Sequence, residues 1–239
     1  MVCEDEAGPY QAIPQPGGSW RPEGMADTQP HEYFRGGTAK MLTLLRPSSG
    51  ELRTCPVART PNSVLHPWLM GELEDVLAGL PEGRADVDEH WRDWETWRWP
   101  RQRIENYTLK PSEDVRMLLV LDNLTGHYSK PFVAWCLECG VALLYTPLAG
   151  SWLNMAESVQ RIIVRRAIGG QHYETSAQLM DALSSASIWW NANPTPFVWG
   201  GKRKQRRDRA RDRRHALGGS AAYANRPIAR GSQALPRAA

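Results

Sequence analysis

Two short apolar runs, separated by one helical segment, constrain the fold of this chain more than any other feature. The first, Val115–Leu121 (VRMLLVL), is bounded by polar residues, and the second, at 141–145 (VALLY), ends before Thr146. Strands that helices cover on both faces give such runs instead of an alternating pattern. Residues 129–139 suit a helix, so this region predicts a β-α-β unit with parallel strands and a right-handed crossover.

The preceding residues predict further strands and one long helix. A strand is predicted at 2–6, one or two strands within 33–46 and another at 51–57, with the Gly- and Pro-rich residues 7–31 as loop and turns. Apolar residues at helical spacing predict helices over about 64–80 (Ser63 as a possible cap), 154–168 (apolar stripe Met155, Val159, Ile162 and Ile163) and about 175–191. The order predicts an α/β fold with a central mixed sheet flanked by helices on both faces.

The charge of the chain is concentrated at its C-terminal end. Lys and Arg number 29 and Asp and Glu 26, a net charge of +3, but residues 202–239 alone carry +10, which leaves −7 on the first 201 residues. A tail of this kind is typical of segments that neutralise nucleic-acid phosphates, although a solvated, disordered terminus is the alternative. The nucleic-acid-binding residues predicted in it are Lys202, Arg203, Lys204, Arg206 and Arg207.

Composition excludes several classes of protein. Hydrophobic residues at 41% and charged residues at 23% argue against a wholly disordered or fibrous chain. No apolar run approaches the roughly 18–20 residues that span a bilayer, and the acidic N-terminus lacks the pattern of a signal peptide, so we expect an intracellular protein without a membrane partner. Cys136 and Cys139 form a C-x-x-C without a second pair, which favours buried helix-face cysteines over a zinc site.

Residues 82–113 are polar and rich in tryptophan. Trp91, Trp94 and Trp97 fall three apart, with Trp99 just beyond. Indoles at this spacing favour a short amphipathic helix that docks against the core. Stacking of these indoles on unpaired bases is the alternative.

Three acidic side chains are candidates for catalysis. Asp122 follows a predicted parallel strand at its carboxyl end, where open α/β sheets bind ligands, although an Asp-Asn turn with Asn123 would also explain it. Glu157 lies in a predicted helix, where it also fits a capping pair with Asn154. Asp5 ends the first predicted strand, with Glu4 and Glu6 as competing carboxylates.

Carboxylates from these three places would lie on one edge of the sheet. Oxygen-rich clusters of this kind bind Mg²⁺ or Mn²⁺, and two such ions about 4 Å apart can activate the attacking oxygen and stabilise the leaving oxygen of a phosphodiester. Three acids in one cleft would repel each other without the cations.

Several blocks resemble the mariner-type DDE transposases, and specifically their bacterial insertion-sequence branch. LLVLDNLTGH and LLYTPLAGSWLNMAESVQ resemble the second and third catalytic blocks, with 34 residues between Asp122 and Glu157, and CEDEAG resembles the first. NPTPFVW at 193–199 resembles the C-terminal segment of the family, and W-x-P-x-G at 20–24 its early hairpin. The resemblance covers about residues 1–200.

The resemblance implies an RNase H-like catalytic domain at 1–200, with 82–113 as an insertion and 201–239 as the basic tail. It implies that Asp5, Asp122 and Glu157 hold two Mg²⁺ or Mn²⁺ ions and that Asn154 positions the helix of Glu157. Asn123 and His127 would line the cleft. Arg161 could face the DNA backbone, but an i,i+4 salt bridge with Glu157 is favoured.

The implied activity is cleavage at transposon ends followed by strand transfer into target DNA. The expected partners are transposon-end and target DNA, with a homodimer assembled on the DNA, in the bacterial cytoplasm and at the nucleoid. Helix-turn-helix domains precede the first catalytic strand in the family, and this chain begins about two residues before that strand. We therefore expect a fragment, a product that the element encodes in two reading frames, or a misassigned start. The alternatives are an inactive remnant that only binds nucleic acid and a nuclease of the same fold without strand transfer.

Overall fold

A computed structural model gives the fold, and it describes residues 1–13, 22–25, 32, 34–81, 115–148, 150–197 and 208. The chain divides into two units, Met1–Phe197 and Val198–Ala239. Of the second unit only Asp208 is described, and all the helices and strands named below belong to the first unit. The tryptophan-rich region 82–113 and the basic residues Lys202 to Arg207 lie outside the described residues.

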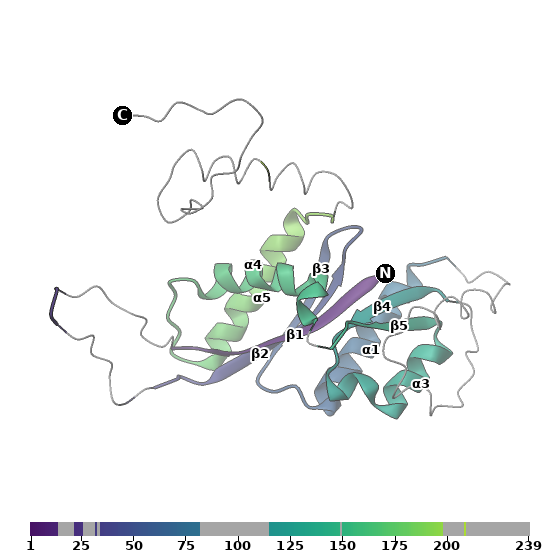
Figure 1. Ribbon diagram of the computed structural model, residues 1–239, viewed down its shortest axis with the longest axis horizontal. Coiled ribbons are helices and arrows are strands. Elements are labelled where there is room, and N and C mark those ends of the chain that lie inside the picture. Colours follow the sequence, from purple (N-terminus) through teal and green to yellow (C-terminus); the bar gives the residue numbers. More distant parts are fainter. Residues whose placement is uncertain are drawn as a thin grey trace. The chain divides into compact units, whose positions relative to one another are not determined.

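A five-stranded mixed sheet forms the centre of the first unit (Figure 1). The strands are β1 (Val2–Gln11), β2 (Thr38–Arg46), β3 (Glu51–Val57), β4 (Met117–Leu121) and β5 (Val141–Tyr145), and they lie in the order β3-β2-β1-β4-β5. β1 pairs antiparallel with β2, and β2 with β3, whereas β1 pairs parallel with β4, and β4 with β5. This topology is the predicted RNase H-like one, and it places β1 at the centre of the sheet.

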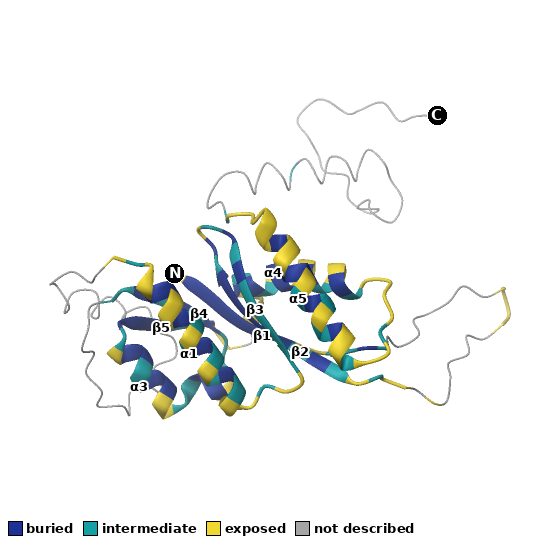
Figure 2. Cartoon of the chain, turned by 180° about the vertical axis from the view of Figure 1, so that it is seen from behind, coloured by how far each residue is buried: buried dark blue, intermediate teal, exposed yellow. Residues whose placement is uncertain are grey.

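Helices cover both faces of the sheet, as the apolar runs predict. One face packs against α1 (Asn62–Ala78) and α3 (Lys130–Glu138), and the other against α4 (Met155–Ile168) and α5 (Ser176–Ala192). Figure 2 shows the buried strands between helices whose outer faces are exposed. Because β4 and β5 are parallel and joined through α3, their carboxyl ends meet at the same edge of the sheet.

Some predicted boundaries are wrong. The first strand continues to Gln11 instead of ending at residue 6, because Ala7 to Gln11 pair with β2 across an irregularity. The long helix begins at Asn62, with Pro61 and not Ser63 at its cap. Ile162 is 45% exposed and does not belong to the buried face of α4, which consists of Ala156, Val159, Gln160, Ile163 and Ala167.

The C-x-x-C motif behaves as predicted for structural cysteines. Cys136 is fully buried on α3, and Cys139 at the end of that helix is partly buried; neither forms a disulfide. Burial raises the pKa of the Cys136 thiol well above its usual value, which makes it a poor nucleophile and a poor metal ligand.

The last turn of α5 is fastened to the hairpin of β2 and β3. Asn191 receives a hydrogen bond from the backbone N–H of Leu52 and donates one to its carbonyl oxygen, and Trp190 Nε1 donates to Gly50 O over 2.7 Å. Gly50 has a positive φ of 78°, and a Cβ there would lie 2.5 Å from the carbonyl carbon of Thr195. The glycine therefore lets the segment after α5 approach the hairpin, where Phe197 N donates to Pro47 O.

Among the described residues, none of the helices combines the length and the apolar character needed to cross a bilayer.

Candidate active site

Asp5 lies in the middle of β1, on the face that α4 covers. It pairs across the sheet with Thr43 of β2 and is only 9% exposed. Burial raises its pKa to about 7, and the negative charges of Glu4, Asp122 and Glu157 contribute to the rise. The charges of Asp122 and Glu157 act on Asp5, so the fold brings all three predicted carboxylates into one neighbourhood, from three different elements.

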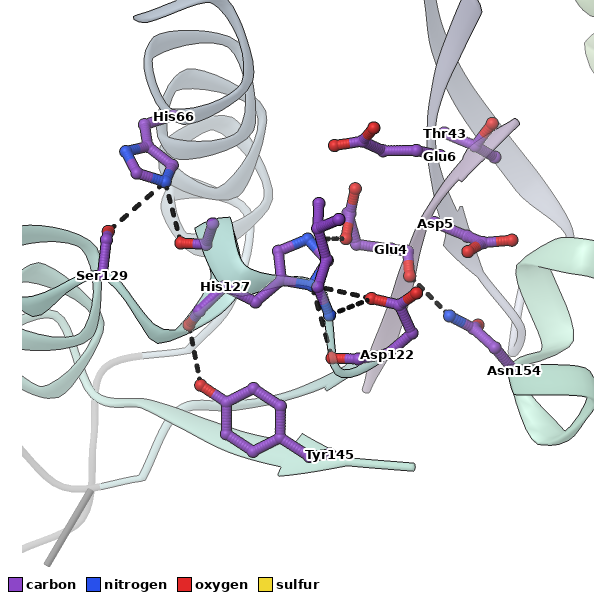
Figure 3. Close-up of polar contacts among 12 residues, drawn as sticks. Glu4, Asp5, Glu6, Thr43, His66, Asp122, His127, Ser129, Tyr145 and Asn154 are labelled. Carbon is purple, nitrogen blue, oxygen red and sulfur yellow. Dashed lines mark hydrogen bonds and ion pairs between the residues drawn. The ribbon is translucent and has the colours of Figure 1, made fainter. Parts of the chain in front are cut away.

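Asp122 follows β4 directly and is held through one carboxylate oxygen. Its Oδ1 accepts a hydrogen bond from the backbone N–H of Leu124 (2.9 Å) and lies 3.0 Å from Nδ1 of His127 (Figure 3). Burial alone would raise the pKa of Asp122, but the bonds from His127 and Leu124, together with the charge of His127, hold it below its usual value. Asp122 therefore stays ionised.

Glu157 lies in the first turn of α4 and forms an ion pair with Arg161 on the same helix. Arg161 Nη2 is 2.5 Å from Glu157 Oε1, which is the i,i+4 pair favoured by the spacing. The other oxygen, Oε2, is buried and has no hydrogen-bond partner among the described residues. A buried carboxylate oxygen without a partner is costly unless a ligand or a cation binds it.

Two side chains fasten α4 to the backbone of β1. Asn154 caps α4 by accepting from Ala156 N and donates from Nδ2 to Glu4 O (2.5 Å). Gln160, one turn after Glu157, donates from Nε2 to Asp5 O and to Thr43 Oγ1, each over 3.1 Å. The two anchors lie on either side of Glu157 in the sequence, so they fix this residue relative to Asp5.

Asn123 and His127 are both predicted to line the cleft, but the structure places them differently from each other. Asn123 donates to Thr146 O (2.6 Å) and accepts from the hydroxyl of Tyr128, so its side chain joins the loops that follow β4 and β5. His127 is 1% exposed and lies beneath Asp122, with its Nε2 2.9 Å from Glu4 Oε2. Burial would lower the pKa of His127, but Glu4 and Asp122 raise it to about 10, so the imidazole is positively charged.

The donor set suits a hard divalent cation, because all three carboxylates offer oxygen ligands. The described residues nevertheless contain no group of three His, Cys, Asp or Glu side chains already arranged around one metal position. His127 engages Oδ1 of Asp122, and Arg161 engages Oε1 of Glu157. A cation at this site would therefore have Oδ2 of Asp122 and Oε2 of Glu157 as its ligands.

Residues 96–180 match the sequence model of a family described as DDE superfamily endonuclease. This match contains Asp122 and Glu157 and begins after Asp5, so it covers the second and third predicted blocks.

Several solved structures are similar to this chain, although they share little sequence with it. A pre-cleavage Mos1 transpososome is 11% identical over 82% of this chain and 56% of that chain, with a TM-score of 0.40. The Mos1 mariner paired end complex with Mn is 11% identical over 80% and 53%, with a TM-score of 0.37. The catalytic core domain of BIV integrase is 12% identical over 68% and 78%, with a TM-score of 0.36. This chain spans little more than half the length of the Mos1 chains, and no curated protein matches it.

The sequence motifs do not single out two residues that lie beside Asp5, Asp122 and Glu157, namely Gln160 and Glu4. Gln160 is a polar residue on the buried stripe of α4, and that position was the available signal for a buried hydrogen bond. Glu4 was treated only as a competitor of Asp5. The period of two in a strand puts Glu4 and Asp5 on opposite faces, so this signal was present as well.

Proposed function

We propose that this chain is the catalytic domain of a DDE transposase, which cleaves DNA strands and joins the freed 3′ end to target DNA. The observation that carries the proposal is the convergence of Asp5, Asp122 and Glu157, whose mutual charge contributes to a pKa of about 7 for Asp5. Members of this superfamily depend on divalent metal ions. The DNA complexes among the similar structures support DNA as the partner, with transposon ends and target DNA as the substrates.

Asp5, Asp122 and Glu157 would hold two Mg²⁺ or Mn²⁺ ions. Such a pair supplies activation of the attacking oxygen and stabilisation of the leaving oxygen of a phosphodiester. Asp122 would bind with Oδ2, because His127 and Leu124 both engage Oδ1. Asn154 and Gln160 would keep the helix of Glu157 in register with Asp5. Glu157 would bind with Oε2, because Arg161 engages Oε1.

The basic tail would contribute phosphate contacts. Nine Lys and Arg residues lie in 202–214, and each phosphate contact releases counterions and steepens the salt dependence of binding. Removal of residues 201–239 should therefore weaken DNA binding and reduce its salt slope. A homodimer on the DNA and an origin in a bacterial insertion sequence remain part of the proposal, and sedimentation of the protein with end-like DNA tests the first.

The decisive experiment is incubation with supercoiled plasmid in the presence of Mn²⁺. The wild-type chain should nick the plasmid, Asp122→Asn should abolish nicking, and Asp181→Asn, an exposed acid on α5, should leave it unchanged. Nicking that survives Asp122→Asn would contradict the proposal. Joined products would distinguish a transposase from a nuclease, and salt-sensitive gel shifts without any cleavage would indicate an inactive nucleic-acid-binding remnant.

A further inference from the structure

Glu4 is a fully buried acid that the proposed chemistry does not use. It lies on the opposite face of β1 from Asp5, and its Oε2 lies 2.9 Å from Nε2 of His127 (Figure 3). The contact is an ion pair by distance, and neither oxygen of Glu4 has a hydrogen-bond partner of good geometry among the described residues. The same imidazole contacts Asp122 through Nδ1 at 3.0 Å, so one histidine ring lies between Glu4 on β1 and Asp122, which follows β4.

Stability does not explain this arrangement. The same face of β1 carries Val2, and Glu4 pairs across the sheet with Leu44; both neighbours belong to the hydrophobic core. Buried ion pairs can often be replaced by apolar residues of similar volume with no loss of stability, because desolvation offsets the attraction between the charges. An unpartnered oxygen on Glu4 adds to that cost.

The arrangement does fix the orientation of the imidazole. Glu4 engages Nε2, and Tyr145 donates from its hydroxyl to His127 O over 2.8 Å, so both the ring and the backbone of His127 are held. Asp122 and its two successors belong to neither a helix nor a strand. The direction of its carboxylate therefore depends on the contacts of Oδ1, which come from the backbone N–H of Leu124 and, as the one side chain among them, from His127.

We propose that Glu4 is a positioning residue of the DDE site, which acts through His127 to hold the carboxylate of Asp122 in the orientation for binding a divalent cation. The proposal rests on the proposed function. β1 then serves the site from both faces, with Asp5 on one and Glu4 on the other. Residues that orient metal ligands through hydrogen bonds commonly alter metal affinity or activity by about tenfold to a hundredfold when they are replaced.

The test measures Mn²⁺ binding and folding separately, in the full chain. Mn²⁺ affinity is measured from the electron paramagnetic resonance signal of the free ion, and the melting temperature is measured in EDTA. Glu4→Gln and Glu4→Leu should both bind Mn²⁺ about tenfold or more weakly. Removal of one partner of a buried pair lowers stability, so both should melt below the wild type in EDTA, and Glu4→Gln, which keeps a polar group opposite the imidazole, should melt higher than Glu4→Leu. In plasmid nicking, Glu4→Gln should lower kcat and leave KM for DNA unchanged.

Glu6→Gln is the matched control. Glu6 lies two residues further along β1, also has a buried oxygen without a hydrogen-bond partner among the described residues, and lies 3.6 Å from Lys40 instead of contacting His127. Its replacement removes the same charge from the same face of the strand. The Mn²⁺ affinity of Glu6→Gln should equal that of the wild type.

Three results would overturn the proposal. Wild-type Mn²⁺ affinity in both Glu4 variants would show that Glu4 does not act on the site. An equal loss of Mn²⁺ affinity in Glu6→Gln would show a general effect of charge. A loss of affinity confined to Glu4→Leu, the less stable variant, would show an effect of reduced stability instead of positioning. In each case the wild-type chain still binds Mn²⁺ and nicks DNA, whereas failure of the proposed function would abolish both in the wild type itself.

Discussion

The side-chain amide of Asn154 donates a hydrogen bond to the carbonyl oxygen of Glu4, and this bond joins the start of α4 to the middle of β1. The carbonyl belongs to the residue directly before Asp5, and Asn154 precedes Glu157 by three positions. One buried side chain therefore sets the distance between the first and the third predicted carboxylate. The same side chain caps α4 through its oxygen.

Replacement of Asn154 by Ala should impair both stability and metal binding. The loss of a helix cap costs about 0.5–2 kcal/mol, and an unpartnered buried carbonyl costs roughly 1–3 kcal/mol. We expect the free energy of unfolding, measured by urea denaturation, to fall by roughly 2–4 kcal/mol, and Mn²⁺ affinity to fall with it. Thr175→Ala removes the cap of α5 without any contact to β1, so it should cost about 1 kcal/mol and leave Mn²⁺ affinity unchanged. Equal effects of the two variants on Mn²⁺ affinity would refute the role of the Asn154–Glu4 bond.

Gln160 should matter to the site although it carries no charge. Gln160→Leu keeps the side chain buried and removes the donors to Asp5 O and Thr43 Oγ1. We expect a loss of roughly 1–3 kcal/mol in the free energy of unfolding, because two buried acceptors lose their partner. Nicking should slow as Asp5 loses its register with α4. A variant with wild-type activity and reduced stability would show that Gln160 serves the core alone.

Removal of Arg161 should strengthen metal binding. Arg161 is 72% exposed and pairs with Glu157, whose side chain is 28% exposed, and pairs of this kind contribute roughly 0–1 kcal/mol to folding. Arg161→Ala should therefore leave the melting temperature nearly unchanged and lower the dissociation constant for Mn²⁺ by about two- to fivefold, because the positive charge of Arg161 no longer repels a cation beside Glu157. Arg165→Ala, one turn further along α4, controls for the loss of positive charge. Weaker Mn²⁺ binding by Arg161→Ala would instead make Arg161 part of the site.

The β-α-β unit and the helix of Glu157 could be predicted from the sequence because their signals are local. The apolar runs ending at Leu121 and Tyr145 and the Asn154 cap depend only on neighbouring residues, and their elements lie within a few residues of the predicted positions. The extent of β1 beyond residue 6 could not be predicted, because Gly8 and Pro9 suggest a turn and only pairing with β2 reveals a strand. Local patterns carry no information about such long-range pairing.

The contacts among the acids were equally inaccessible from sequence. Ion pairing of His127 with Glu4, across 122 intervening residues, depends on the parallel pairing of β1 with β4, which the motif spacing does not encode. The resemblance directed attention to His127 as a cleft residue, whereas the fold buries it. The pairing of Arg161 with Glu157 could be predicted, because positions i and i+4 always adjoin on a helix.

The raised pKa of Asp5 predicts a stability that depends on both pH and metal. In the folded chain, burial raises the pKa of Asp5 from 3.8 to about 7, and the charges of Glu4, Asp122 and Glu157 contribute. Between these two pH values the folded state therefore retains a proton that the unfolded state has already lost. The contribution of Asp5 to stability is therefore fully present below about pH 4 and is lost as the pH rises to about 7. Three pKa units correspond to roughly 4 kcal/mol, which sets an upper limit for this loss.

Asp5→Asn should remove this pH dependence. In EDTA at pH 8 the variant should be more stable than the wild type by up to roughly 4 kcal/mol, and at pH 4 the two should unfold at nearly the same urea concentration. Mg²⁺ at pH 8 should raise the melting temperature of the wild type and not that of Asp5→Asn, because the cation binds only the folded, ionised site. Asp181→Asn, on the exposed side of α5, should follow the wild type under all of these conditions. Both effects require the carboxylate of Asp5. If the stability of Asp5→Asn fell with pH between 4 and 7 as steeply as that of the wild type, Asp5 would not be coupled to the other acids. If Mg²⁺ still raised the melting temperature of Asp5→Asn, Asp5 would not be a metal ligand.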